Sequence, residues 1–165
     1  MLFLRADLSQ AEEKLPNDER RTPRWLFARI NEQFKFTVDA AAAAENALCE
    51  RYWTKETDGL KQDWTGCRIW CNPPYSRGQL RQWIQKASDS AAVSVLLIPG
   101  DCSTVASQLA LATATEICFL NQRLRFDDEG NGAKFCNWLV LFDCLGWYRS
   151  RLRGLNLGAV LTCGS

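Results

Sequence analysis

Apolar residues recur with the spacing of one helix face in two long stretches of the chain, residues 23 to 34 and 78 to 91. In the first stretch they are Trp25, Leu26, Phe27, Ile30 and Phe34. In the second they are Leu80, Trp83, Ile84 and Ala87. Thr22 and Pro23 suit the start of the first helix, because a threonine can cap it and a proline is tolerated in its first turn. Both stretches are therefore predicted to be helices.

Shorter apolar runs between these stretches have the composition of strands. Residues 36 to 39 alternate, residues 67 to 71 lead into a proline-rich loop, and residues 93 to 98 are apolar with a single serine between them. Ser103 is predicted to cap a third helix that ends near residue 113. Two successive units of strand and helix predict a parallel sheet covered by helices.

The remaining sequence predicts an antiparallel hairpin at the end of the sheet. Strands are expected at residues 115 to 120, 122 to 127 and 136 to 143, with a turn between the last two. Only 32 residues separate Asp39 from Asn72, which is too few for two full units of strand and helix. The predicted fold class is therefore α/β, with an abridged sheet and a C-terminal antiparallel hairpin.

The chain is predicted to form one domain with an arm and a tail. Residues 1 to 21 are rich in charge and poor in apolar side chains, which favours a mobile arm. Residues 22 to 143 contain the predicted helices and strands and form the domain. Within them, residues 45 to 64 set aromatic side chains among polar ones, which is typical of an ordered loop. Residues 144 to 165 receive no assigned structure.

The composition excludes several classes of protein. With 20 Lys and Arg against 19 Asp and Glu the net charge is +1, so any surface for nucleic acid must be a local patch. The sequence contains no histidine, which removes Ser-His-Asp and Cys-His hydrolases. No apolar run reaches the roughly 20 residues of a membrane span and no signal peptide is evident, so a cytoplasmic protein is expected.

Eight cysteines are scattered along the chain. Without a signal peptide, free and mostly buried thiols are a better interpretation than disulfides. A zinc site is the weaker alternative, because there is no Cys-x-x-Cys pair and no histidine. No metal is predicted.

Three loops that follow predicted strands carry polar residues suited to chemistry. They contain Asp39, Asn72 to Tyr75, and Pro99 to Asp101. In an open α/β sheet the binding crevice lies beyond the carboxyl ends of the strands. The three loops are therefore predicted to converge on one site.

The Asn72-Pro73-Pro74-Tyr75 loop is suited to hold an amino group. Its prolines fix the backbone and remove two donors, which leaves the Asn72 amide and backbone carbonyls as acceptors. The amino nitrogen of adenine is a poor nucleophile until its N–H groups are hydrogen-bonded, and the Asn72 side-chain oxygen and Pro73 carbonyl can accept those bonds. Tyr75 would stack on a base extruded from the duplex. The alternative is a stiffened strand exit whose tyrosine only packs.

Several short motifs occur in an order that resembles a known family. They are Thr22-Pro23-Arg24-Trp25-Leu26-Phe27, Val38-Asp39-Ala40-Ala41-Ala42, Glu45-Asn46-Ala47-Leu48-Cys49, Tyr52-Trp53-Thr54 and Asn72-Pro73-Pro74-Tyr75-Ser76. With further motifs up to about residue 143, they resemble the phage N-6-adenine DNA methyltransferase (Dam-like) family. The resemblance implies a Rossmann-like sheet, S-adenosylmethionine as methyl donor and double-stranded DNA as substrate. It also implies a phage or prophage origin and action in the bacterial host cytoplasm.

The resemblance assigns roles to individual residues. It implies that the catalytic residues are Asn72, Pro73, Pro74 and Tyr75. It implies that the cofactor-binding residues are Thr22, Pro23, Trp25, Asp39, Ala40, Asp63 and Asn72. Asp39 resembles the acid at the end of the first strand, Asp63 the acid that meets the cofactor adenine, and Trp25 an aromatic near the sulfonium. In the alternative interpretation both acids are surface acids and Trp25 belongs to the core.

Arginines near the catalytic loop and the predicted hairpin are candidates for DNA contact. They are Arg77, Arg81, Arg123 and Arg125. They are placed to clamp phosphates around a flipped base, and plain surface charge is the alternative. The chain departs from the wider methyltransferase pattern because no Gly-x-Gly follows Asp39 and no small Gly-Ser run precedes the final strand.

The predicted function is site-specific methylation of adenine N6 in DNA. One alternative keeps the chemistry of the Asn-Pro-Pro-Tyr loop but acts on RNA or on protein glutamine. An alternative from another class is a methyltransferase-like domain that binds DNA or a partner protein without catalysis.

Overall fold

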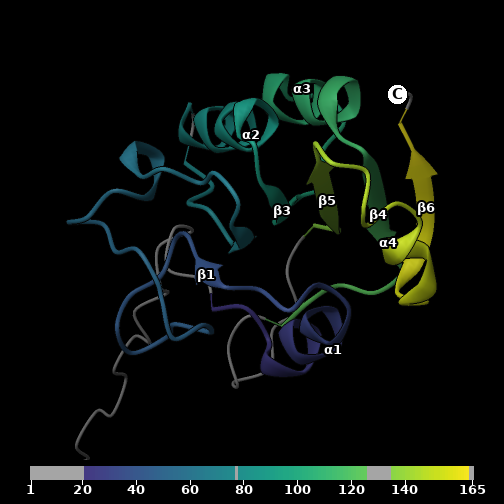
Figure 1. Ribbon diagram of the computed structural model, residues 1–165. Helices are drawn as coiled ribbons and strands as arrows, with labels where there is room; N and C mark the ends of the chain where they lie inside the picture. The colour runs from purple at the N-terminus through teal and green to yellow at the C-terminus, as the bar shows by residue number, and fades with distance from the viewer. Residues whose placement is uncertain (1–20, 77, 126–134, 164–165) are drawn as a thin grey trace, which may run out of the picture.

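A six-stranded sheet runs through the molecule in the order β1-β2-β3-β5-β4-β6 (Figure 1). The computed structural model describes residues 21–76, 78–125 and 135–163, so the predicted arm lies almost wholly outside the described residues. The strands are β1 Val38–Asp39, β2 Arg68–Cys71, β3 Val93–Pro99, β4 Glu116–Leu120, β5 Asn137–Asp143 and β6 Gly158–Thr162. The helices are α1 Arg24–Phe34, α2 Gln79–Asp89, α3 Val105–Thr113 and α4 Arg151–Gly154, with a 3-10 turn η1 at Gly59–Lys61.

The sheet combines a parallel half with an antiparallel half. β1, β2 and β3 are parallel to one another, whereas β5 runs antiparallel to both of its neighbours, β3 and β4. β6 is antiparallel to β4 and forms the last position in the order. These findings confirm the predicted α/β class and the abridged sheet, which has fewer parallel strands than a doubly wound sheet of two full halves.

Helices cover the two faces of the sheet (Figure 1). α2 and α3 lie side by side over one face, and their apolar residues pack on Ile69, Leu96 and Val140 of the strands. α1 lies on the other face, where Leu26 and Ile30 join a second apolar cluster. This second face holds the residues that the site described below requires.

An irregular loop, residues 40–67, takes the place of a helix between β1 and β2. Its Trp53 and Trp64 pack on the α2 face beside Trp83, with the ring centroids of Trp64 and Trp83 6.2 Å apart. The Trp64 indole donates to the Gly59 carbonyl oxygen at 2.9 Å. The prediction of an ordered loop is thus confirmed, and its Trp53 and Trp64 belong to the core.

Two predicted helix starts are shifted by one residue. Pro23, not Thr22, is the cap position of α1, and no side chain caps that helix. α3 begins after Thr104, whose hydroxyl accepts from the Ser107 N–H at 3.1 Å. Ser103 is instead tied to the preceding turn, because its hydroxyl donates to Asp101 Oδ1 at 2.6 Å.

The strand predicted at residues 122 to 127 is wrong for the residues that the structure describes there, 122–125. They form no strand, and Leu124 is buried in the cluster on the α1 face. Both edges of β4 are already paired, one with β5 and one with β6, so no position beside it is open to another strand. The hairpin of the sheet is therefore β4 with β5, joined by a longer connection.

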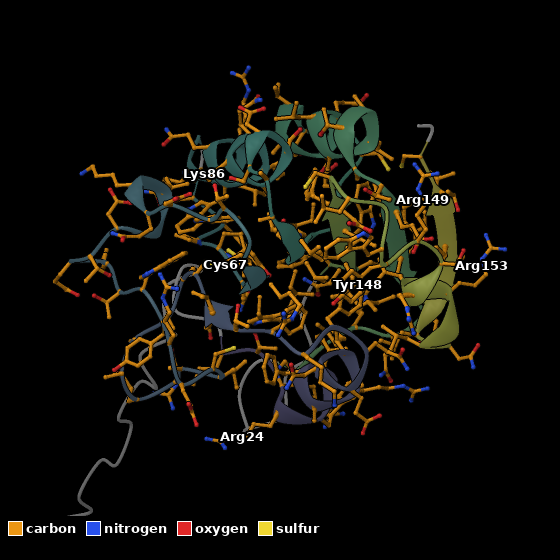
Figure 2. The ribbon with its side chains drawn as sticks, in the orientation of Figure 1. Arg24, Cys67, Lys86, Tyr148, Arg149 and Arg153 are labelled. Atoms are coloured by element: carbon orange, nitrogen blue, oxygen red, sulfur yellow. The ribbon has the colours of Figure 1, made fainter. Side chains whose placement is uncertain are left out.

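The last part of the chain, left without assigned structure by the sequence, packs against the sheet. Glu116 of β4 is fully buried and accepts from the backbone N–H groups of Ser150 and Leu152. Tyr148 stacks on Phe34 of α1 with ring centroids 5.3 Å apart, and Tyr148 is labelled in Figure 2. β6 then completes the edge.

All eight cysteines are free thiols, but the prediction that most are buried is wrong. Only Cys71 and Cys118 are buried, whereas three are exposed. Burial raises the pKa of Cys49 to about 12 and that of Cys71 well above its ordinary value. Neither thiol is therefore an ionised nucleophile at neutral pH. Among the described residues, no helix is both long and apolar enough to cross a membrane.

Candidate active site

The carboxyl ends of the parallel strands bring two of the predicted loops to one pocket. β1 ends at Asp39 and β2 leads directly into Asn72, and both residues line a small pocket on the α1 side of the sheet. The complete lining is Arg21, Thr22, Asp39, Ala41, Asn46, Leu48, Trp70 and Asn72. The third predicted loop follows β3 at the same edge, but its residues do not line this pocket.

Asp39 is a buried acid with few compensating partners. Its side chain is 3% exposed, and the Leu48 N–H donates to its Oδ2 at 3.1 Å. Burial raises the pKa of Asp39 from 3.8 to about 6, against the opposing effect of the backbone N–H groups of Leu48 and Ala41. At neutral pH the carboxylate is mostly ionised, so a strong hydrogen-bond acceptor faces the pocket.

The Asn72-Pro73-Pro74-Tyr75 loop folds back on itself at the end of β2. The Tyr75 hydroxyl lies 2.9 Å from Asn72 Oδ1 and 3.3 Å from the Leu97 carbonyl oxygen. Its ring meets the edge of the Phe135 ring, with centroids 6.2 Å apart. Asn72 Oδ1 is thus an acceptor that already holds a donor in a half-buried position.

Trp70 forms the inner wall of the pocket. Its indole is fully buried and packs against Phe27 at 5.6 Å and Phe36 at 5.7 Å between ring centroids. Trp70 is the register partner of Asp39 in the neighbouring parallel strand. The backbone joins the two strands there, because the Ala40 N–H donates to the Trp70 carbonyl oxygen at 2.9 Å.

The structure brings together some of the predicted cofactor residues and separates others. Thr22, Asp39 and Asn72 share the pocket, and Pro23 follows Thr22 without lining it. Trp25 is 48% exposed on α1 and therefore does not belong to the core. Ala40 points into the cluster on the opposite face, and its neighbour Ala41 lines the pocket instead.

Asp63 lies far from the pocket along the strand direction. Its Oδ1 accepts from the Thr65 N–H at 2.9 Å. The residue after Thr65 is Gly66, whose backbone N–H donates to the carbonyl oxygen of Ala91, just before β3. Asp63 is therefore an exposed residue at the amino edge of the sheet, opposite the edge that holds Asn72. This placement separates it from the predicted cofactor residues.

Several lining residues were not predicted from the sequence. Asn46 and Leu48 come from the loop after β1, where the Asn46 side-chain oxygen accepts from the Ala43 N–H at 2.8 Å. Both belong to a motif that carries the family resemblance, so that motif was a usable signal. Trp70 gave no signal, because an aromatic in a strand is ordinarily a core residue.

The candidate DNA contacts lie at exposed positions of two elements. Arg81 is exposed in the first turn of α2, which follows the Asn-Pro-Pro-Tyr loop. Arg123 and Arg125 are exposed on either side of the buried Leu124, in the segment that follows β4. Arg77 lies outside the described residues. Figure 2 shows further arginines elsewhere on the surface, with Arg24 at the start of α1 and Arg153 on α4.

Comparison with known proteins identifies similar sequences over most of the chain. A family model described as DNA N-6-adenine-methyltransferase (Dam) matches residues 9–141. The chain is 35% identical over 114 residues to the DNA N-6-adenine-methyltransferase of Escherichia phage T1, in a match that covers 67% of this chain and 48% of that protein. It is 32% identical over 125 residues to the DNA N-6-adenine-methyltransferase of Haemophilus phage HP1 (strain HP1c1), covering 72% of each. The match thus spans about half the length of the first relative.

Proposed function

The chain belongs to the DNA N-6-adenine-methyltransferase (Dam) family, and on that premise we propose that it methylates the exocyclic amino group of adenine in double-stranded DNA. One observation carries the proposal. Asn72 belongs to the Asn-Pro-Pro-Tyr loop and also lines the pocket that contains Asp39. A group bound in this pocket and a base held by the loop would therefore meet at the same residue.

The residues that line this small pocket are suited to contact part of S-adenosylmethionine, which would supply an electrophilic methyl group on a sulfonium when bound. The buried Asp39 carboxylate is an acceptor for hydroxyl or ammonium groups of such a ligand. The half-buried Thr22 and Asn46 add polar side chains, and Leu48 adds an apolar wall. The residues present thus match a ligand that is polar at several points and apolar between them.

Asn72 is the acceptor for the adenine amino group in this proposal. The lone pair of that nitrogen is delocalised into the ring, and hydrogen bonds from its N–H groups to Asn72 Oδ1 and the Pro73 carbonyl make it available for in-line transfer. The Tyr75 hydroxyl, now 2.9 Å from Asn72 Oδ1, is the donor that the amino group replaces. The proton released after transfer goes to solvent.

The Tyr75 ring holds the flipped base. An adenine paired in a duplex is out of reach of the loop, so the base must be extruded and stacked. Arg81, Arg123 and Arg125 are exposed on the elements that leave this edge of the sheet, where they would contact phosphates around the extruded base. The contribution of Arg77, next to the loop in sequence, follows the same reasoning.

The test is a label-transfer assay with the full chain. Radiolabelled S-adenosylmethionine is incubated with duplex DNA, RNA or a glutamine-containing protein, and the DNA is digested to nucleosides. We expect label on N6-methyl-2′-deoxyadenosine from DNA and no label on RNA or protein. Label on RNA or on glutamine would identify that molecule as the substrate in place of DNA. Binding of DNA without transfer of label would support a domain that binds DNA without catalysis.

Two variants make this assay specific for the loop. Asn72→Ala removes one acceptor of the amino group and should reduce methyl transfer by about 100-fold or more, as loss of a transition-state hydrogen bond does elsewhere. Gln82→Ala, which removes an exposed amide on α2, should leave transfer unchanged. Equal rates for the two variants would refute the role of Asn72.

A further inference from the structure

The indole N–H of Trp70 is a buried donor without an acceptor among the residues that the structure describes. The side chain is fully buried. Trp64, equally buried on the opposite face, donates its indole N–H to the Gly59 carbonyl oxygen. Buried donors are normally paired, and an unpaired one next to a pocket points to a partner that arrives from outside the chain.

Trp70, which carries the unpaired donor, is the neighbour of Asp39 in the adjacent strand. The two residues are register partners in adjacent parallel strands, and their neighbours Val38 and Ile69 both pack on the opposite face. Because side chains alternate along a strand, Asp39 and Trp70 project from the same face. Both line the same pocket.

The acceptor of Asp39 and the donor of Trp70 together determine which chemical group can bind between the two side chains. A ligand carboxylate would accept from the indole but repel Asp39, and an ammonium would donate to Asp39 but leave the indole unpaired. A hydroxyl can donate to the carboxylate and accept from the indole at once. The geometry points to a hydroxyl-bearing ligand.

We propose that Trp70 Nε1 and Asp39 together bind one ribose hydroxyl of the adenosyl ligand, with Trp70 as a positioning residue that no catalytic motif marks. The proposal rests on the proposed function, because it takes S-adenosylmethionine as the occupant of the pocket. In this arrangement the ribose is fixed between β1 and β2, and Trp70 stands two residues before Asn72, where the Asn-Pro-Pro-Tyr loop begins.

The test uses the full chain and the product analogue S-adenosylhomocysteine, with affinity measured by calorimetry. Trp70→Phe removes the N–H and keeps an aromatic ring against Phe27 and Phe36. We expect it to bind the ligand about 10-fold more weakly, the effect of losing one hydrogen bond. Its melting temperature should fall less than that of Trp64→Phe, because both variants lose the same ring volume but only Trp64→Phe also loses a hydrogen bond. The matched control, Trp64→Phe, removes a paired N–H and should lower the melting temperature while leaving affinity unchanged.

A second ligand separates a direct contact from a general loosening of the pocket. Analogues of S-adenosylhomocysteine that lack the 2′ or the 3′ hydroxyl are compared in the unsubstituted protein and in Trp70→Phe. Loss of the contacted hydroxyl should weaken binding to the unsubstituted protein clearly more than binding to Trp70→Phe.

The outcomes are distinct. Equal affinity of Trp70→Phe and the unsubstituted protein, or equal losses for both analogues in both proteins, would overturn the role of Trp70 and leave the proposed function intact. Failure of the unsubstituted protein to bind S-adenosylhomocysteine at all would overturn both.

Discussion

Asp39 is a buried acid whose proposed role in ligand binding would come at a cost in stability. Its burial at the end of β1 raises its pKa from 3.8 to about 6, which means that the folded protein resists its ionisation. The same burial makes the ionised carboxylate a strong acceptor in the pocket. A site residue that costs stability in this way is a common feature of binding and catalytic sites.

Substitution of Asp39 by asparagine should stabilise the protein in a pH-dependent way. Between pH 3.8 and about 6 the folded state keeps a proton that the unfolded state has lost, so stability falls as pH rises through this window. Above the window Asp39→Asn should gain at most about 3 kcal/mol in free energy of unfolding, measured by urea titration from pH 4 to 7.5. Asp63→Asn, an exposed control, should show no such gain. A gain that is equal at pH 4 and pH 7 would mean that ionisation is not its cause.

The affinity for the ligand should also depend on the Asp39 carboxylate, but it should rise with pH where the stability falls. If ionised Asp39 is the acceptor, the affinity for S-adenosylhomocysteine should fall as pH drops below about 6. In Asp39→Asn the affinity should be lower and should lack this dependence. Calorimetry at pH 5, 6 and 7.5 checks both, and a parallel pH profile for the two proteins would assign the dependence to another group.

Tyr75 is expected to act through its ring more than through its hydroxyl. Tyr75→Phe keeps the stacking surface and removes the donor that occupies Asn72 Oδ1, so methyl transfer should change by less than about fivefold. Tyr75→Ala should weaken the productive DNA complex by about 1–3 kcal/mol, the usual value of base stacking on an aromatic. Initial rates over a range of DNA concentrations check the pair. A large loss in Tyr75→Phe would mean that the hydroxyl takes part in the reaction.

At the scale of residues, the sequence predicted pocket residues at the ends of strands and missed those within strands. Asp39 and Asn72 were found because a polar residue directly after an apolar strand is conspicuous. Trp70 was missed because nothing in a sequence tells which face of a short strand borders a pocket. Asp63 does not line the pocket, and its contact with the cofactor adenine stays a prediction.

At the scale of elements, the loop between β1 and β2 covers the face of the sheet that a crossover helix normally covers. Parallel neighbours normally require a helix to cover the face between them. Here Trp53 and Trp64 supply that cover, and Gly59 lets the loop approach the strand closely. A Cβ on Gly59 would lie 2.2 Å from the Ala40 carbonyl oxygen and 2.8 Å from the Trp83 ring.

Gly59→Ala should therefore destabilise the protein and disturb the pocket. The added methyl must push the backbone next to Asp39, and we expect a loss of about 1–3 kcal/mol in free energy of unfolding, together with weaker ligand binding. Gly154→Ala is the matched control, because a Cβ there meets nothing within 4 Å. Urea unfolding and calorimetry check both variants. Equal behaviour of the two would show that the loop adjusts without cost.

Elements with long, regular patterns were predicted correctly, and elements fixed by distant contacts were not. α1 and α2 follow periodic sequences and β3 is a nearly continuous apolar run, so their existence could be predicted from the sequence alone. The strand expected at residues 122 to 127 failed because both edges of β4 are occupied by segments further along the chain. Pairing of that kind cannot be seen in a local pattern.

At the scale of the whole molecule, the segment after β5 holds the antiparallel half together. Glu116 binds the backbone of Ser150 and Leu152, and β6 pairs along all of β4. The abridged sheet and the α/β class could be predicted from the spacing of motifs. The role of this segment could not, because its acceptor, Glu116, lies more than 30 residues earlier and resembles any other acid in a strand.

Glu116→Ala should release this segment. Two backbone donors lose a buried acceptor, so the free energy of unfolding should fall by about 2–4 kcal/mol. Trypsin should then cleave more rapidly at Arg149, Arg151 or Arg153, two of which are labelled in Figure 2. Glu116→Gln keeps one acceptor oxygen and should lose less. Unfolding titration and mass spectrometry of the fragments check this, and unchanged cleavage in Glu116→Ala would mean that β6 alone anchors the segment.

The position of β5 has a consequence for synthesis on the ribosome. This strand lies in the middle of the sheet, between β3 and β4, yet its residues 137–143 are translated after both of its neighbours. A nascent chain that has emerged only as far as β4 holds two strands with an unfilled gap between them and exposes their apolar surface. Folding is therefore delayed until late in translation, and incomplete chains are targets for chaperones and proteases.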